Sequence, residues 1–225
     1  MARKPADQSV NREEIITAAA DVLSRRGYET ATMKDIAAAV NLTAASLYHH
    51  FRSKDALLLA VLEMGLEFTI NRIQPITCQR GLSAEERLRA MIREHIVGVA
   101  DNPAVGAAMV FEIHALSHAK PPTRRAKPED VQAFEAFLTQ RDAFFRRRDA
   151  FEHLFRAVVQ EGVRSGEFHP VDVPIFVKAL LGANNWVGVW YRPDGRLSGE
   201  AIAAEITGYF IPALVMRKGA RDGLV

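Results

Sequence analysis

The sequence has a single cysteine, Cys78, among 225 residues, which excludes an internal disulfide. It contains no glycine-rich phosphate loop and no Gly-x-Ser-x-Gly elbow, and Cys78 has no partner histidine at a known motif spacing, so nothing in it argues for catalysis. No charged start followed by an apolar run marks a signal peptide, and even the apolar segment 173–190 carries Lys178. We therefore expect a cytoplasmic protein that is not an enzyme and needs no cofactor.

Alternating β-branched runs and internal repeats are also absent, which predicts an all-α fold. Neither sign of charge is in large excess: the net charge is +2, and residues 1–55 carry eight Lys and Arg against seven Asp and Glu. With 48% hydrophobic residues, the chain is long enough for a small head and a larger body with its own core. Composition alone therefore does not reveal a partner.

The segment 32–55 has the start and stop signals of two short helices joined by a tight turn. Thr32 and Asp35 have the spacing of a capping box at the start of the first helix. Asn41 tolerates the left-handed backbone of a sharp reversal, and Thr43 can cap the second helix. Two short helices across such a turn make a helix-turn-helix, which predicts binding to double-stranded DNA.

The second helix would turn Leu47 and Phe51 to the core and its other side to a DNA groove. Lys54, in the first turn of the next helix, opposes the helix dipole, and a bound phosphate would explain it where local stability would not. The alternative is an ordinary helix surface with solvated charges, which the linked pattern disfavours. We predict DNA contacts from nine residues: Thr32, Lys34, Thr43, Ala44, Ala45, Ser46, Tyr48, His49 and Lys54.

The pattern Thr-x-x-x-Ile-Ala-x-x-x-x-Leu-Thr-x-x-x-Leu-Tyr-x-His-Phe-x-Ser-Lys-x-x-Leu closely resembles the tetracycline-repressor (TetR) family of bacterial transcription regulators. The resemblance covers roughly 11–70 and implies a first helix over 11–26 that supports the other two. The chain departs from the family's usual glycines at Asn41 and Ala45, so its base preference need not be that of its relatives. We expect a flexible basic arm over 1–10, a DNA-binding head over 11–71 and a helical ligand-binding and dimerisation domain over 72–225.

The body reads as successive helices with clear start and stop signals. We expect helices over 84–100, 103–116 and 129–164, a further helix capped by Asp172 in the segment 172–192, and a last helix from Ser198 to about Met216. A basic, proline-rich loop over 118–128 separates the second and third of them, and its charges fit solvation better than nucleic-acid binding.

The segment 172–192 is apolar nearly all round, so we expect it to be buried on all sides. The family resemblance implies that the last two helices of each subunit form a four-helix bundle in a homodimer. A single reading helix also recognises too few base pairs for specificity, which favours a dimer on a palindromic operator. We predict a dimer interface formed by Phe176, Leu180, Ala183 and Val187.

Trp186 and Trp190 lie four residues apart, and the sequence around them resembles a subclass of repressors of fatty-acid and steroid-side-chain breakdown that respond to acyl-coenzyme A thioesters. Two indoles can flank an apolar ligand while a guanidinium binds an anionic group. The resulting prediction for the effector site is Phe111, His114, Asn184, Trp186, Trp190 and Arg192. Alternatively, both tryptophans anchor the core or the dimer, and Arg192 only caps carbonyls at the helix end.

His114 and His118 share a helix face at a spacing that suits zinc, but no third ligand follows at a fixed spacing, which favours a polar lining or a solvated pair and no metal. The sequence thus predicts a homodimeric repressor that a small apolar or acyl-coenzyme A ligand releases from its operator. Two alternatives stay open: a DNA-binding regulator without an effector, and a ligand-binding protein with a vestigial head. Activation in place of repression also stays open.

Overall fold

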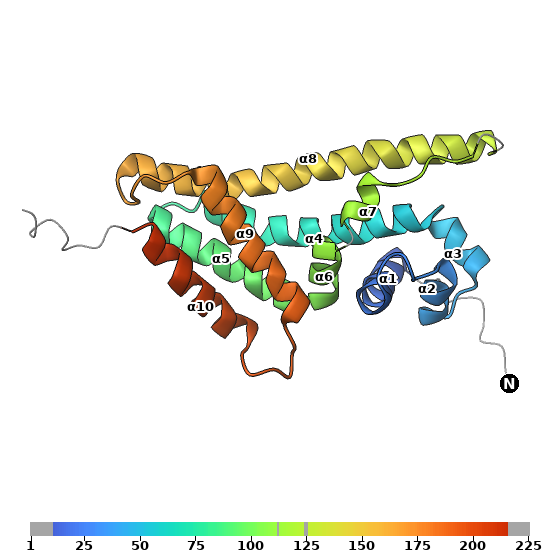
Figure 1. The fold of residues 1–225 in the computed structure, drawn as a ribbon, viewed down its shortest axis with the longest axis horizontal. Helices are drawn as coiled ribbons and strands as arrows, with labels where there is room; N and C mark the ends of the chain where they lie inside the picture. Colours follow the sequence, from blue (N-terminus) through green and yellow to red (C-terminus); the bar gives the residue numbers. More distant parts are fainter. Residues whose placement is uncertain (1–10, 112, 124–125, 216–225) are drawn as a thin grey trace, which may run out of the picture. The chain divides into compact units, whose positions relative to one another are not determined.

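The computed structural model describes residues 11–111, 113–123 and 126–215, in which helices are joined by turns and loops. The elements are α1 (Arg12–Arg26), α2 (Met33–Ala39), α3 (Ala44–His50), α4 (Lys54–Thr77), α5 (Ala84–Asp101), α6 (Pro103–Phe111), α7 (Ile113–Ser117), α8 (Pro128–Ser165), α9 (Val173–Trp190), α10 (Gly199–Phe210) and the 3₁₀ helix η1 (Ile211–Ala213) (Figure 1). In these ranges the only β pairing is an isolated bridge between Phe168 and Val215. The all-α prediction is confirmed.

The helices begin where the sequence places caps. The side chains of Asn11, Thr32 and Thr43 accept hydrogen bonds from the first turns of α1, α2 and α3. Ser83 and Glu86 close a full capping box at the start of α5, and the Asp172 side chain accepts from the Ile175 amide in α9. Each cap satisfies an N–H group that the helix itself leaves unpaired.

The ends of α2 and α10 differ in how the backbone stops the helix. Asn41 adopts φ 57° in the turn between α2 and α3, as expected for a left-handed reversal. The last helix, expected to reach Met216, ends at Phe210 and continues only as η1. Pro212 has no N–H to donate to a further α-helical turn, which explains the early end. Met216 itself lies outside the described residues.

The chain divides into two compact units. One comprises Met1–Met64 and Ala107–Phe144, and the other comprises Gly65–Gly106 and Phe145–Val225. This division differs from the expected boundary after residue 71, because α4 is one continuous helix and because the segment 107–144 groups with the head. The expected arm over 1–10 lies outside the described residues.

The first unit contains the head, in which α1 packs on α2 and α2 on α3. Its core consists of aliphatic side chains that are almost entirely removed from solvent: Ile15, Ala19, Leu23, Ile36, Leu47 and Leu57. These side chains fix the angle between α2 and α3, and so set which side of α3 faces outward.

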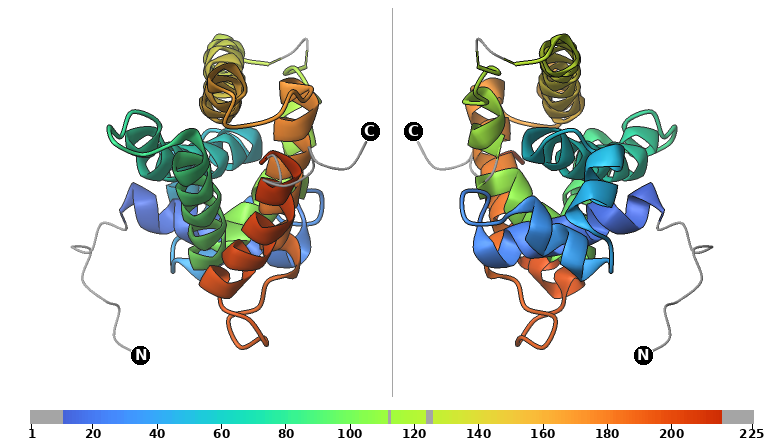
Figure 2. Two further views of the ribbon diagram at one scale, coloured as in Figure 1. Left: turned by 90° about the vertical axis from the view of Figure 1, so that its left-hand side faces the viewer. Right: turned by 90° about the vertical axis from the view of Figure 1, so that its right-hand side faces the viewer.

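In the second unit, α5 lies beside α9 and α10. The left-hand view of Figure 2 shows α5 and α10 side by side. A Cβ added to Gly106 would lie 3.2 Å from the Cα of Gly188, so the backbones of α6 and α9 approach closely at these glycines. None of the helices in the described ranges combines the length and apolarity needed to cross a membrane.

Candidate functional site

The second helix of the predicted helix-turn-helix is α3, and its two sides differ in burial. Leu47 is fully buried and Phe51, at its C-terminal end, is nearly so. The Thr43 oxygen accepts from the Ser46 amide at 3.1 Å and holds the first turn. Burial of one side and capping of the start leave the opposite side of α3 for a partner.

That opposite side carries most of the predicted DNA-contact residues. Thr43, Ala45, Tyr48 and His49 are exposed, and Tyr48 keeps 46% of its surface accessible. Lys34 on α2 is exposed as well, while Ala44 and Ser46 are half-buried. The head therefore presents hydroxyl, aromatic and imidazole groups on a short helix, the chemistry that reads base edges and phosphates in a major groove.

Thr32 is exposed but already engaged in the capping box. Its hydroxyl contacts the Asp35 carboxylate at 2.7 Å, and its backbone N–H donates to the same carboxylate at 3.0 Å. These hydrogen bonds, together with the nearby Arg26 guanidinium, hold the pKa of the Asp35 carboxyl below its usual value. The box orients α2, and a DNA contact from Thr32 stays a prediction.

Lys54 has local partners that the sequence did not reveal. Its ammonium donates to the carbonyl oxygens of Tyr28 at 2.6 Å and Ala31 at 3.0 Å, and it lies 4.2 Å from the centre of the Tyr28 ring. The statement that local stability does not explain Lys54 is therefore wrong. The half-buried lysine ties the start of α4 to the loop after α1, and a phosphate contact stays a prediction without that supporting reason.

Arg12 belongs to the head in a way that sequence reasoning missed. Its guanidinium carbon lies 4.8 Å from the centre of the Phe51 ring. This cation–π contact connects the first turn of α1 to the end of α3. No local pattern relates two residues so distant in the chain, so sequence periodicity could not have found it.

In the second unit, α9 has a buried and an exposed side. Leu180 and Val187 are fully buried within their own subunit, so the prediction that they form the dimer surface is wrong. Burial against α5 and α10 already uses that side of the helix. Phe176 and Ala183 are half-buried, and the Phe176 ring packs edge-on against Phe210 of α10 at 5.8 Å.

The exposed side of α9 is strongly apolar. Ile175, Trp186 and Trp190 retain 64%, 50% and 47% of their surface, and Gly182 would meet no atom within 4 Å if it carried a Cβ. The expectation that this helix is buried on all sides does not hold within one chain. The apolar face of α9, defined here as Ile175, Ala179, Gly182, Trp186 and Trp190, is open to a partner.

The predicted effector residues of α9 do not share one side of the helix. Asn184 points into the core of the second unit and has no exposed surface, whereas Trp186 and Trp190 lie on the outer side of the same helix. Arg192 is exposed and donates to the Tyr191 carbonyl at 3.0 Å, which matches the alternative in which it caps the helix end. Phe111 and His114 belong to the other compact unit.

The residue that sequence reasoning missed here is His95 on α5. It is 3% exposed and its Nδ1 lies 3.3 Å from the Nδ2 of Asn184 on α9. Burial lowers the pKa of His95 to about 4, so the imidazole is neutral at physiological pH. The available signal was its register with the buried Met91, Ile92 and Val99 on one side of α5.

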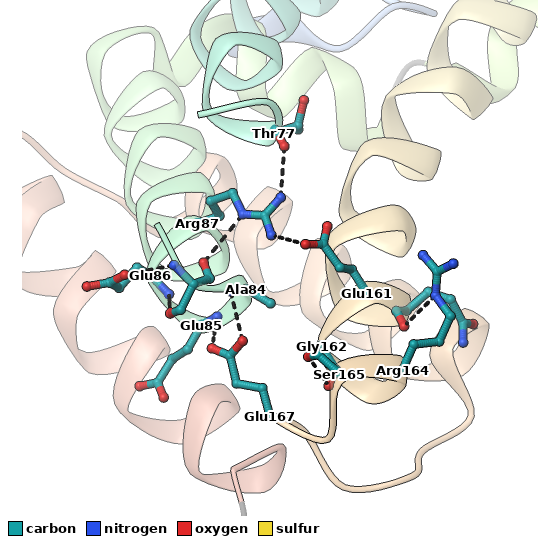
Figure 3. A network of polar contacts seen from close by, with 12 residues as sticks. Thr77, Ala84, Glu85, Glu86, Arg87, Glu161, Gly162, Arg164, Ser165 and Glu167 are labelled. Carbon is teal, nitrogen blue, oxygen red and sulfur yellow. Dashed lines mark hydrogen bonds and ion pairs between the residues drawn. The ribbon is translucent and has the colours of Figure 1, made fainter. Parts of the chain in front are cut away.

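A polar network joins the ends of three elements in the second unit (Figure 3). Arg87 donates to the Thr77 carbonyl at 3.0 Å and to the Glu161 carboxylate at 2.5 Å. The hydrogen bond to Arg87 lowers the pKa of Glu161. Glu167 accepts from the Ala84 and Glu85 amides, which places a carboxylate at the positive end of α5. These contacts hold the helices together, and the Arg87, Glu161 and Glu167 side chains are all paired within the unit.

The hypothesis of a histidine metal site gains no support. The Nδ1 of His118 lies 2.9 Å from the backbone oxygen of His114, one turn earlier, so this nitrogen already has a protein partner. Across the ranges that the structure describes, no three side chains of His, Cys, Asp or Glu group as metal ligands would.

Known proteins share both halves of the chain. Residues 15–61 match the family of bacterial regulatory proteins, tetR family, and residues 138–214 match the tetracyclin repressor-like C-terminal domain. The HTH-type transcriptional repressor KstR2 of Mycolicibacterium smegmatis is 27% identical over 217 residues, 96% of each chain. The nucleoid occlusion factor SlmA of Vibrio atlanticus is 30% identical over 177 residues, 78% of this chain and 80% of that protein.

Among solved structures, AibR in complex with isovaleryl coenzyme A and operator DNA is similar to this chain, with a TM-score of 0.69 and 27% identity. The match covers 89% of this chain and 98% of AibR. The head geometry and these relatives agree. The chain therefore belongs to the TetR family of bacterial regulatory proteins, and it is a helix-turn-helix transcriptional regulator and not an enzyme.

Proposed function

We propose that the protein is a homodimeric repressor that binds a palindromic operator in the cytoplasm and is released from it by a small apolar or acyl-coenzyme A ligand. The observation that carries the DNA part is the exposed side of α3, with Tyr48 and His49 opposite the fully buried Leu47. Thr43, Ala44, Ala45, Ser46 and Lys34 complete the proposed contact surface, with Thr32 and Lys54 at its edges. This arrangement suits insertion into a major groove.

The apolar face of α9 supports the homodimer. A row of large apolar side chains around a glycine is costly to leave in water and allows close approach of a second helix. A second copy presents the same face, as an isologous interface requires. Two α3 helices about 34–36 Å apart would then enter successive major grooves.

One relative supports the effector class and another supports repression. AibR binds isovaleryl coenzyme A as well as operator DNA in its crystal structure, and KstR2 is a repressor. By linkage, a ligand that weakens operator binding by some factor is itself bound more weakly by the operator complex, by the same factor. This reciprocity gives a test that needs no assumption about the shape change.

The experiment begins with selection of operator sequences from random double-stranded DNA by the full-length protein. A palindromic consensus is expected, and its absence would contradict a symmetric dimer on DNA. The operator complex is then titrated with acyl-coenzyme A thioesters of increasing chain length. We expect at least one thioester to raise the operator Kd about tenfold or more, a coupling of about 1.4 kcal/mol.

The ligand's own Kd is then measured with and without operator. A thioester with equal affinity for free and operator-bound protein would contradict the release mechanism. If no thioester changes operator affinity, the protein is a regulator without this effector. If no DNA sequence is selected at all, the head is vestigial and the DNA part of the proposal fails.

A further inference from the structure

A buried pair of polar side chains interrupts the core of the second unit. His95 lies on α5 and Asn184 on α9, 89 positions apart in the chain, and the Nδ2 of Asn184 is 3.3 Å from the Nδ1 of His95. Asn184 has no exposed surface and His95 is 3% exposed. Removing both polar groups from water costs free energy, and only hydrogen bonds inside the protein can offset that cost. Each buried polar atom of the pair is therefore expected to have a partner.

One half of the Asn184 amide has no such partner. Its Oδ1 is buried and receives no hydrogen bond. The NH₂ group is the half of the amide that lies beside His95. One hydrogen-bonding position of the buried amide is therefore unused, and leaving it so lowers the stability of the folded chain.

The surroundings of the pair are aromatic. The rings of Phe151 and Phe155 on α8 lie 5.4 Å and 6.0 Å from the His95 ring, and they pack edge-on against each other at 5.5 Å. An apolar wall beside a few converging polar atoms is the usual composition of a small-molecule site.

The pair also lacks charge. His95 is neutral at physiological pH, since burial lowers its pKa to about 4. Among the described residues of the second unit, the only buried charged side chain is Arg87, which is already paired with Glu161. A carboxylate or phosphate would therefore find no counter-ion here, whereas a neutral hydroxyl can donate to an amide oxygen or accept from an amide NH₂.

We infer that Asn184 and His95 form the polar subsite that receives a neutral hydroxyl group on the apolar part of the effector, with Phe151 and Phe155 beside it. The inference rests on the proposed function, because it assigns the acyl part of the ligand to this place. It makes the protein selective for a hydroxylated acyl chain over the chain that lacks the hydroxyl.

Isothermal titration of the full-length protein with two matched pairs of probes tests this assignment. The pairs are isovaleryl-coenzyme A with 3-hydroxyisovaleryl-coenzyme A, and octanoyl-coenzyme A with 3-hydroxyoctanoyl-coenzyme A. In at least one pair, we expect the hydroxylated thioester to bind about tenfold or more tightly, because a site built around a hydroxyl discriminates against its absence. Asn184→Leu, which keeps the size of the side chain, should reduce this ratio to about one.

The control variant is Thr207→Val, which removes another buried polar group of the same unit and should leave the ratio unchanged. Equal binding of both members of each pair by the wild-type protein would overturn the inference and leave the proposed function intact. Failure of all four thioesters to bind would reject the acyl-thioester class, and the inference with it. If Asn184→Leu does not fold, the wild-type ratio decides the question alone.

Discussion

The ammonium group of Lys54 donates a hydrogen bond to the backbone carbonyl oxygen of Tyr28 at 2.6 Å. This contact spans 26 positions and joins the first turn of α4 to the loop that follows α1. The phenol of Tyr28 in turn donates to the Asp55 carboxylate. A lysine that opposes the α4 dipole is thus stabilised by carbonyl oxygens and an aromatic ring, which changes what its mutation should do.

Replacement of Lys54 by Met should lower the free energy of unfolding by about 1–2 kcal/mol, because the carbonyls of Tyr28 and Ala31 lose a charged donor. Urea denaturation would measure this loss. If Lys54 also contacts a phosphate at the edge of the proposed DNA surface, the slope of log operator affinity against log salt should fall by about one in this variant. A slope that stays at the wild-type value would remove Lys54 from the contact surface and leave its role in stability.

The second prediction concerns the outward side of α3. Tyr48→Ala should raise the operator Kd about tenfold or more and leave the melting temperature nearly unchanged, because Tyr48 is exposed and packs little of the head core. Electrophoretic mobility shift with the selected operator, alongside calorimetry, would separate the two effects.

Leu47→Ala on the inner side of the same helix provides the contrast. It should lower the free energy of unfolding by about 2–5 kcal/mol, because it leaves a cavity in the core of the head. An operator Kd that is the same for Tyr48→Ala and the wild type would show that Tyr48 is not part of the contact surface.

The third prediction concerns the apolar face of α9. Gly182→Arg should convert the dimer to a 25.0 kDa monomer, because a long charged side chain would occupy the centre of the proposed interface. The fold of each subunit should persist, since the position is open and arginine is a better helix former than glycine by roughly 1 kcal/mol. Sedimentation equilibrium would report the mass.

Gln160→Arg on an exposed position of α8 adds the same charge elsewhere and should leave the dimer intact. A dimer that tolerates Gly182→Arg would show that the two copies meet on another surface.

The fourth prediction is a pH dependence of stability. The pKa of His95 falls from 6.5 in the unfolded chain to about 4 in the folded protein. Below pH 6.5 the unfolded chain binds a proton at His95, whereas the folded protein does not bind it until the pH approaches 4. The part of the free energy of unfolding that depends on the neutral His95 is therefore fully present above pH 6.5 and is lost as the pH falls toward 4. Between pH 6.5 and 5 the loss should be about 2 kcal/mol.

His95→Phe should remove this part of the pH dependence, and urea denaturation at pH 7, 6 and 5 would measure it. His153→Phe, at an exposed position of α8, should keep the wild-type slope. If the His95 variant loses stability with pH as steeply as the wild type, the buried imidazole is not the group responsible.

The caps and turns were predictable because they depend on residues within a few positions. Thr32 and Asp35 form their box three residues apart, and Asn41 adopts its positive φ beside the helix that it ends. The family pattern of the head arises from the same short-range signals, so the helix-turn-helix could be read from the chain. The last helix ends at Phe210, short of the predicted Met216, because Pro212 cannot donate a hydrogen bond to a further α-helical turn.

What the sequence by itself determined is therefore the all-helical fold, the ends of most helices and which side of α3 faces outward, all of which follow from local backbone hydrogen bonding and from periodicity. Only the tertiary structure decided the partners of Lys54, the pairing of His95 with Asn184 and which side of α9 is open. Those depend on contacts between residues 23 to 89 positions apart, and hydrophobic periodicity marks a buried face without saying what it packs against.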